Sequence, residues 1–158
     1  MADLSSLLMQ TIETELLFLR GLSPEQASTP RGGVESWSPK QELGHLIDSA
    51  SNNHIRFVRA ALSGDYEGPG YAQNGWVELH GYRDLPWETL VDFWRQYNLL
   101  LAALIERIPP AAFDAECRIG SNPPVSLEYL IEDYVLHMRH HIDQMLRRPV
   151  ITQYGKPA

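Results

Sequence analysis

The chain has very little cysteine and little positive charge. Cys117 is the single cysteine among 158 residues, so an intrachain disulfide framework and a cysteine-rich zinc site are both excluded. The 13 basic residues are scattered and are outnumbered by 20 acidic ones, which gives a net charge of −7. Because binding to nucleic acid needs clustered lysine and arginine, this composition argues against a nucleic-acid partner.

Long hydrophobic segments are also missing. The longest apolar run, residues 99–105, is far too short to cross a bilayer. The first four residues, Met-Ala-Asp-Leu, lack the basic and apolar regions of a signal peptide. We therefore expect a protein that works in the cytoplasm and has no membrane partner.

The sequence contains four helical patterns and no convincing strand. In each pattern, apolar residues recur at steps of three and four, which is the period of an amphipathic helix. Four such helices can bury their apolar stripes against one another as an all-α four-helix bundle. We expect one domain over residues 1–149 and a tail over residues 150–158. The predicted helices cover approximately residues 3–20, 38–63, 86–108 and 126–148.

The ends of these helices carry their own signals. Ser38, Pro39 and Gln41 form a capping-box pattern, which predicts the start of the second helix. Gly64 would end that helix, and the two prolines at residues 109–110 would stop the third. The connections at residues 63–85 and 109–125 are unusually long. Such connections either cover a site or are plain surface loops, and for residues 63–85 both interpretations stay open.

Histidines on the fourth helix are the strongest functional signal. Half of the six histidines fall in residues 137–141. His137 and His141 are four residues apart, so they share one helix face and can bind one metal ion. The alternative is a polar flank on a surface helix. No glutamate lies between these two histidines, so the His-Glu-x-x-His pattern of zinc proteases is absent.

A third ligand would have to come from elsewhere in the chain, and three histidines are candidates. His54 lies within the apolar stripe of the second helix, where a hydrogen-bonded core histidine is the more common finding. His80 lies in a long connection, so its position cannot be inferred. His45 lies on the polar side of the second helix, and periodicity predicts that it is exposed unless that side lines a cleft.

Several short motifs occur in an order that resembles the DinB-like superfamily. They are Trp-Ser-Pro at residues 37–39, Gly-His-Leu-Ile-Asp at 44–48, Ser-Leu at 126–127, and His-x-x-His-His-x-x-Gln at 137–144. The resemblance spans nearly the whole chain. The superfamily includes damage-inducible DinB proteins, proteins described as metal-dependent hydrolases, and bacterial thiol-dependent transferases.

The resemblance implies a four-helix bundle with an up-down-down-up path. It also implies three metal-ligating histidines, which correspond here to His45, His137 and His141. The implied metal is divalent, with nickel or zinc as the usual occupant, and homodimers are frequent. Substrates would be small molecules, including a low-molecular-weight thiol. His140 remains a candidate for supporting the ligands.

Three imidazoles would leave a coordination position open, which is typical of a catalytic metal site. We therefore expect a metal-dependent enzyme, either a hydrolase or a thiol transferase. Asp48 is the predicted general base because it lies one turn from His45, and Asp133, Gln144 and Asp48 are candidates for orienting the imidazoles. The alternative is a non-catalytic metal- or ligand-binding bundle with a role in the stress response. A purely structural bundle predicts that the three histidines lie apart.

Overall fold

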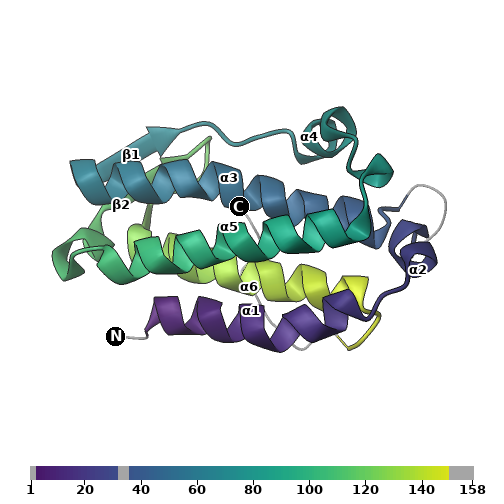
Figure 1. Cartoon of the computed structure of the whole chain (residues 1–158). Helices are drawn as coiled ribbons and strands as arrows, with labels where there is room; N and C mark the ends of the chain where they lie inside the picture. Colours follow the sequence, from purple (N-terminus) through teal and green to yellow (C-terminus); the bar gives the residue numbers. More distant parts are fainter. Residues whose placement is uncertain (1–2, 32–35, 150–158) are drawn as a thin grey trace.

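Four long helices form the framework of the protein. The computed structural model describes residues 3–31 and 36–149, so the predicted tail lies outside the described residues. The first long helix packs against the third and the last, and the second also packs against the third and the last. Figure 1 shows that the second and third long helices in the sequence run in one direction and the first and last run in the opposite direction, which confirms the predicted up-down-down-up bundle. The four are α1 (Leu4–Arg20), α3 (Pro39–Ser63), α5 (Trp87–Arg107) and α6 (Leu127–Met145).

The predicted signals define both ends of α3. The Ser38 backbone N–H donates to Oε1 of Gln41 at 3.0 Å, and the Gln41 N–H donates to Oγ of Ser38 at 3.4 Å, which is the expected capping box. Gly64 follows the helix with φ at +82°, a left-handed conformation that glycine adopts without strain. Ser126 caps the start of α6, where its Oγ accepts from the Tyr129 N–H at 3.1 Å.

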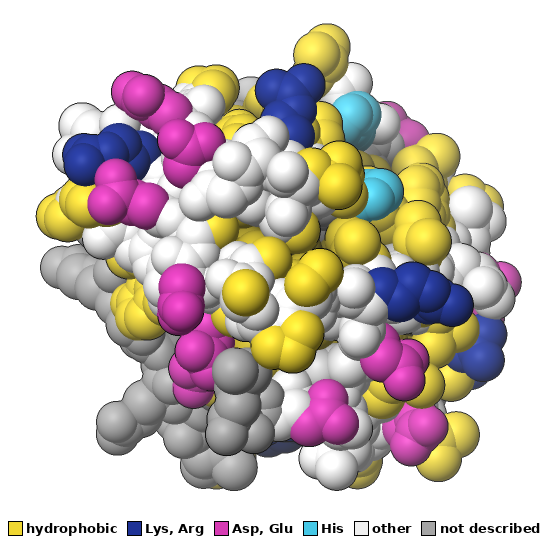
Figure 2. All heavy atoms as spheres, turned by 90° about the vertical axis from the view of Figure 1, so that its left-hand side faces the viewer, with side chains coloured by type: hydrophobic (Ala, Val, Ile, Leu, Met, Phe, Trp, Pro, Cys, Tyr) yellow, Lys and Arg dark blue, Asp and Glu magenta, His cyan; other side chains and the backbone are white. Residues whose placement is uncertain are grey.

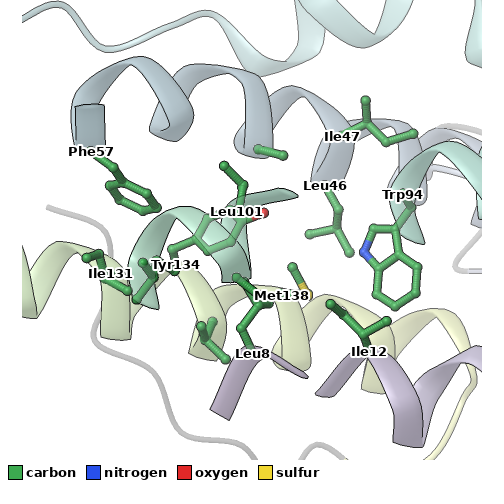
Figure 3. Close-up of a cluster of buried hydrophobic side chains, with 14 of the residues drawn as sticks. Leu8, Ile12, Leu46, Ile47, Phe57, Trp94, Leu101, Ile131, Tyr134 and Met138 are labelled. Atoms are coloured by element: carbon green, nitrogen blue, oxygen red, sulfur yellow. The ribbon is translucent and has the colours of Figure 1, made fainter. Parts of the chain in front are cut away.

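The hydrophobic core runs along the inside of the bundle and contains side chains from all four long helices. Tyr134 places a hydroxyl in this core, and it donates to Oδ1 of Asn98 at 2.6 Å, so the buried polar group is satisfied. None of the described helices is long and apolar enough to pass through a membrane. Figure 3 labels part of the core: Leu8, Ile12, Leu46, Ile47, Phe57, Trp94, Leu101, Ile131, Tyr134 and Met138.

The connections contain more structure than the sequence predicts. Helix α2 (Pro24–Ser28) precedes α3, and the connection from α3 to α5 contains β1 (Asp65–Gly68), α4 (Gln73–His80) and the 3-10 helix η1 (Tyr82–Asp84). This connection returns along the length of the bundle (Figure 1), as the parallel arrangement of α3 and α5 requires. A second 3-10 helix, η2 (Pro110–Asp114), follows α5.

The expectation of no strand is wrong for these connections. Strands β1, β2 (Glu116–Ile119) and β3 (Val125–Ser126) form a small sheet in that order, with β1 parallel and β3 antiparallel to β2. Each strand has only two to four residues, which is too short to display an alternating pattern. The pairing of β1 with β2 joins segments about 50 residues apart, so no local signal marks it. The sheet is a minor addition to the helical bundle.

Candidate metal centre

The structure brings together three histidines from two helices. His45 comes from α3, and His137 and His141 come from successive turns of α6. Each offers one ring nitrogen, and these nitrogens all lie within 4.8 Å of one another. Nε2 of His45 and Nε2 of His137 are 3.2 Å apart. This proximity contradicts the purely structural interpretation, which requires the three side chains to lie apart.

His45 is buried, with an exposed fraction of 1%. Periodicity predicts an exposed side chain here unless the polar side of α3 lines a cleft, and the structure shows the second case, because His45 lines a cavity. The Trp37 ring lies beside His45, with ring centroids 5.1 Å apart. Packing against an aromatic ring fixes the position of the imidazole and shields it from water.

Burial keeps His45 and His137 neutral. It lowers the pKa of His45 to about 3, with a smaller contribution from His141. Burial also lowers the pKa of His137 to about 2, helped by repulsion from the three neighbouring histidines. A neutral imidazole has a lone pair available on one ring nitrogen, which is the form that binds a metal.

Glu42 orients the third histidine. Its Oε1 lies 2.9 Å from Nδ1 of His141, and only 9% of the Glu42 side chain is exposed. This contact favours a proton on Nδ1 of His141, which donates to the carboxylate, and so favours the tautomer that has its lone pair on Nε2. Carboxylate partners of this kind set the tautomer and raise the basicity of metal-binding histidines. No local sequence pattern indicates this role for Glu42, because it lies 99 residues from its partner.

All three histidines line one cavity of about 510 Å³, a volume typical of small-molecule sites. Its walls come from α3, α6 and the sheet. Both long connections contribute to the lining, Tyr71 and Gln73 from the first and Asn122 from the second, so they do more than cross the surface. Figure 2 views the end of the bundle that carries the sheet, where hydrophobic, uncharged and charged side chains are mixed on the surface.

Of the predicted orienting residues, only Asp133 lines this cavity. It lies one helical turn before His137 on α6, and burial, with a smaller effect of Glu132, raises its pKa to about 6. Gln144 instead contacts His140, with Nε2 atoms 3.1 Å apart.

Asp48, the predicted general base, has other partners. Its Oδ1 accepts from the Tyr82 hydroxyl at 2.7 Å and lies 3.0 Å from Nδ1 of His80. Asp48 is not among the residues that line the cavity, and burial raises its pKa. The Asp48 contacts therefore hold η1 and the end of α4 against α3. His54, the remaining candidate ligand, contacts the Tyr97 hydroxyl at 3.0 Å, away from the three histidines.

The donor set fits a divalent transition metal. Three neutral imidazole nitrogens suit zinc, nickel, copper and iron, whereas magnesium and calcium prefer oxygen ligands. The three-histidine group has no carboxylate or thiolate among its members. The assignment of these residues as metal ligands stays a prediction, and the geometry is compatible with it.

The family of the chain follows from comparison with known proteins. The sequence model of the DinB superfamily matches residues 8–145, which is most of the chain. The chain belongs to the DinB superfamily. It is similar to two proteins that carry the name "Putative metal-dependent hydrolase". One, from Bacillus licheniformis, is 30% identical over 124 residues, and the other, from Oceanobacillus iheyensis, is 26% identical over 122 residues. Each match covers 77% of this chain and 69% of the relative.

Two solved structures share the fold. YfiT from Bacillus subtilis, described as a "probable metal-dependent hydrolase with an unusual four-helix bundle topology", has a TM-score of 0.80 and 22% identity, covering 91% of this chain and 82% of YfiT. A mutant of the mycothiol-dependent maleylpyruvate isomerase has a TM-score of 0.74 and 12% identity, covering 97% of this chain and 61% of the isomerase. At these identities the two likenesses establish the fold.

Proposed function

We propose that this DinB superfamily protein is a metal-dependent enzyme in which His45, His137 and His141 hold one divalent metal, nickel or zinc. The observation that carries the proposal is the convergence of three ring nitrogens within 4.8 Å beside a cavity of about 510 Å³. A site with three protein ligands keeps a position for water or a substrate atom. The names of the relatives, which refer to metal-dependent hydrolases, support the same class.

When bound, the metal would supply a Lewis acid that lowers the pKa of a water or thiol. Side chains of the protein would orient the ligands, exclude water and accept a proton. Glu42 holds His141 in one tautomer, and Trp37 shields His45 from water. Asp133 is our proposed general base, in preference to Asp48, because Asp133 lines the same cavity as the histidines and Asp48 does not. With a pKa of about 6, it is mostly ionised at neutral pH and can accept a proton from the nucleophile.

Two reactions use these groups in the same way. In hydrolysis, a water gives its proton to Asp133 and bonds to an electrophilic carbon, while the bond from that carbon to the leaving group breaks and the leaving group takes up a proton. In thiol transfer, the thiol of a low-molecular-weight cosubstrate gives its proton to Asp133, and its sulfur bonds to an electrophilic carbon. The bond from that carbon to the leaving group breaks, and the leaving group takes up a proton. The chain's own Cys117 also lines this cavity, but burial raises the pKa of its thiol and so disfavours the thiolate. We therefore assign the nucleophile to a bound small molecule. Homodimerisation, which the family resemblance implies, remains a prediction.

The test is the metal content and activity of full-length protein purified without a nickel column or chelator. We expect close to one metal ion per chain by elemental analysis, and loss of both metal and turnover in His45→Ala, His137→Ala and His141→Ala. The matched control is His54→Ala, on the same helix as His45 but bonded to Tyr97, which should keep its metal. Turnover is measured in ester-hydrolysis and thiol-transfer screens.

Each outcome separates the candidate functions. Metal-free wild-type protein, or histidine variants that retain the metal, would contradict the metal site. Tight metal retention with consistent absence of turnover in both screens would favour the non-catalytic metal- or ligand-binding bundle.

A further inference from the structure

A row of polar side chains follows α3 away from the metal centre. His45, Ser49, Asn53 and Arg56 follow one another at steps of four, four and three residues, so they share one face of the helix. All four line the cavity, and none is more than 8% exposed. Arg56 ends the row, eleven residues beyond His45, which corresponds to roughly 16 Å along the helix axis.

Arg56 is a buried cation whose neighbours are uncharged. Arg56 is 7% exposed. Among the described residues, no carboxylate lies within salt-bridge distance of its guanidinium. Nη2 donates to the Pro69 carbonyl at 3.2 Å, Nη1 donates weakly to Oδ1 of Asn53 at 3.5 Å, and the Tyr66 side chain is a further hydrogen-bonding neighbour. Burial lowers the pKa of the guanidinium. Desolvating a cation without a counter-charge destabilises a protein, so the position needs another explanation.

We propose that Arg56 binds a carboxylate group of the substrate, at the end of the cavity opposite the three histidines. The assignment rests on the proposed function, because it describes the substrate of the same site. The bound carboxylate would supply the counter-charge that the protein does not provide. Its two oxygens match the planar fork of a guanidinium, which gives both orientation and affinity.

The charges of the cavity favour a carboxylate over a phosphate. Arg56 is the single lysine or arginine among the described lining residues, and Asp133 lines the same cavity. One cation can neutralise one negative charge, whereas a phosphate dianion would keep an excess charge facing Asp133. A monoanionic carboxylate is therefore the better match.

The shape of the cavity indicates an extended substrate. The lining of the cavity also includes the apolar residues Ile119, Val125 and Leu130. A molecule that reaches both ends would carry a reactive group at one end, a carboxylate at the other, and an apolar or uncharged middle. The structure thus points to an elongated organic acid, or to a thiol cosubstrate with a terminal carboxylate.

The test uses hexanoate and its neutral counterpart hexanamide, which share an apolar chain and differ in the carboxylate. Both are titrated by calorimetry or NMR into metal-stripped full-length protein, so that a carboxylate cannot bind a metal instead. We expect wild type to bind hexanoate more tightly than hexanamide. Arg56→Met should weaken hexanoate binding about tenfold or more and leave hexanamide binding unchanged, because a hydrogen bond to a charged group is lost. Arg59→Met, an exposed arginine on the same helix, is the matched control.

Two further variants separate folding and metal effects from anion binding. Arg56→Lys keeps the charge but loses the planar fork, so it should bind hexanoate more weakly than wild type and more tightly than Arg56→Met. His137→Ala should bind hexanoate as wild type does, because its side chain is at the other end of the cavity. If His137→Ala binds hexanoate normally and wild type nevertheless holds no metal, the proposed function fails while the carboxylate site stands.

Three results would overturn the proposal. They are equal binding of hexanoate by wild type and Arg56→Met, equal binding of hexanoate and hexanamide by wild type, and no binding of hexanoate at all. Thermal unfolding of Arg56→Met should stay close to that of wild type. A large loss of thermal stability together with unchanged hexanoate binding would show that Arg56 serves the fold.

Discussion

Two arginines in this bundle lie in opposite electrostatic surroundings. Arg148, just beyond α6, donates to Oε2 of Glu15 and to Oδ1 of Asp143, each at 2.7 Å, and so joins α1 to the end of α6. Arg56, inside the cavity, is more deeply buried and has no carboxylate partner among the described residues. Satisfied charges hold the helices together, whereas the charge in the cavity is left for a ligand. The contrast separates residues that serve the fold from residues that serve the site.

The largest stability effect should come from the paired arginine. Arg148→Met leaves the buried carboxylates of Glu15 and Asp143 close together without a counter-charge. Breaking a buried pair costs about 3–5 kcal/mol, and because about a third of the Arg148 side chain is exposed we expect a loss of about 2–3 kcal/mol. The measurement is the free energy of unfolding in urea, with metal content as a second readout that should not change.

Arg20→Met is the matched control for this prediction. Arg20 also bridges two carboxylates between helices, those of Glu88 and Asp92, but both partners are well exposed. Its loss should cost less than about 1 kcal/mol. If Arg148→Met and Arg20→Met lower the free energy of unfolding equally, burial of the carboxylates around Arg148 does not increase its contribution to stability.

The next prediction concerns metal affinity and Glu42, whose carboxylate contacts His141 in the candidate metal centre. Glu42→Gln keeps the size of the side chain but replaces a charged acceptor of the His141 Nδ1–H with a neutral one. We expect metal affinity to fall about 10- to 100-fold, as for other partners of ligating histidines. A competition titration with a metal chelator measures it. Glu106→Gln, an exposed substitution on α5, should leave the affinity unchanged, and unchanged affinity in Glu42→Gln would remove this residue from the site.

The fold could be predicted because its signals are local. The apolar period and the Ser38 capping box depend on neighbouring residues, so four helices and the start of α3 follow from the sequence. The sheet could not be predicted in the same way, because its short strands are paired by backbone hydrogen bonds between distant segments. Direction and packing order of the helices came from the family resemblance, since helical periodicity does not specify them.

Part of the candidate site could not be predicted either, because it also depends on contacts between distant segments. His137 and His141 are visible as a pair on one helix face, whereas a polar side chain on α3 gives the same signal whether it faces water or an internal cavity. His45 was therefore assigned from the family resemblance, and Arg56 had no distinguishing pattern at all. Glu42 becomes recognisable only when α3 and α6 are placed side by side.

A stability effect smaller than that of Arg148→Met, and of opposite sign, should come from Asp133. In the folded protein burial raises its pKa from 3.8 to about 6, so the fold binds this proton more tightly than the unfolded chain does. Stability therefore increases as the pH falls from about 6 towards 3.8, and the ionised carboxylate destabilises the fold at neutral pH. Asp133→Asn should raise the free energy of unfolding near neutral pH by on the order of 1 kcal/mol, with the difference vanishing in acid.

The same Asp133 substitution should reduce turnover of metal-loaded protein by about 100-fold, since the proposed base is lost. Urea unfolding of metal-stripped protein at neutral and acidic pH measures the first effect, and kinetics of the metal-loaded protein measure the second. Asp114→Asn, at an exposed position, should change neither. If Asp133→Asn is more stable and has slower turnover than wild type, Asp133, like Arg56, serves the site and not the fold. A less stable Asp133→Asn with normal turnover would place it with Arg148, among the groups that hold the helices together.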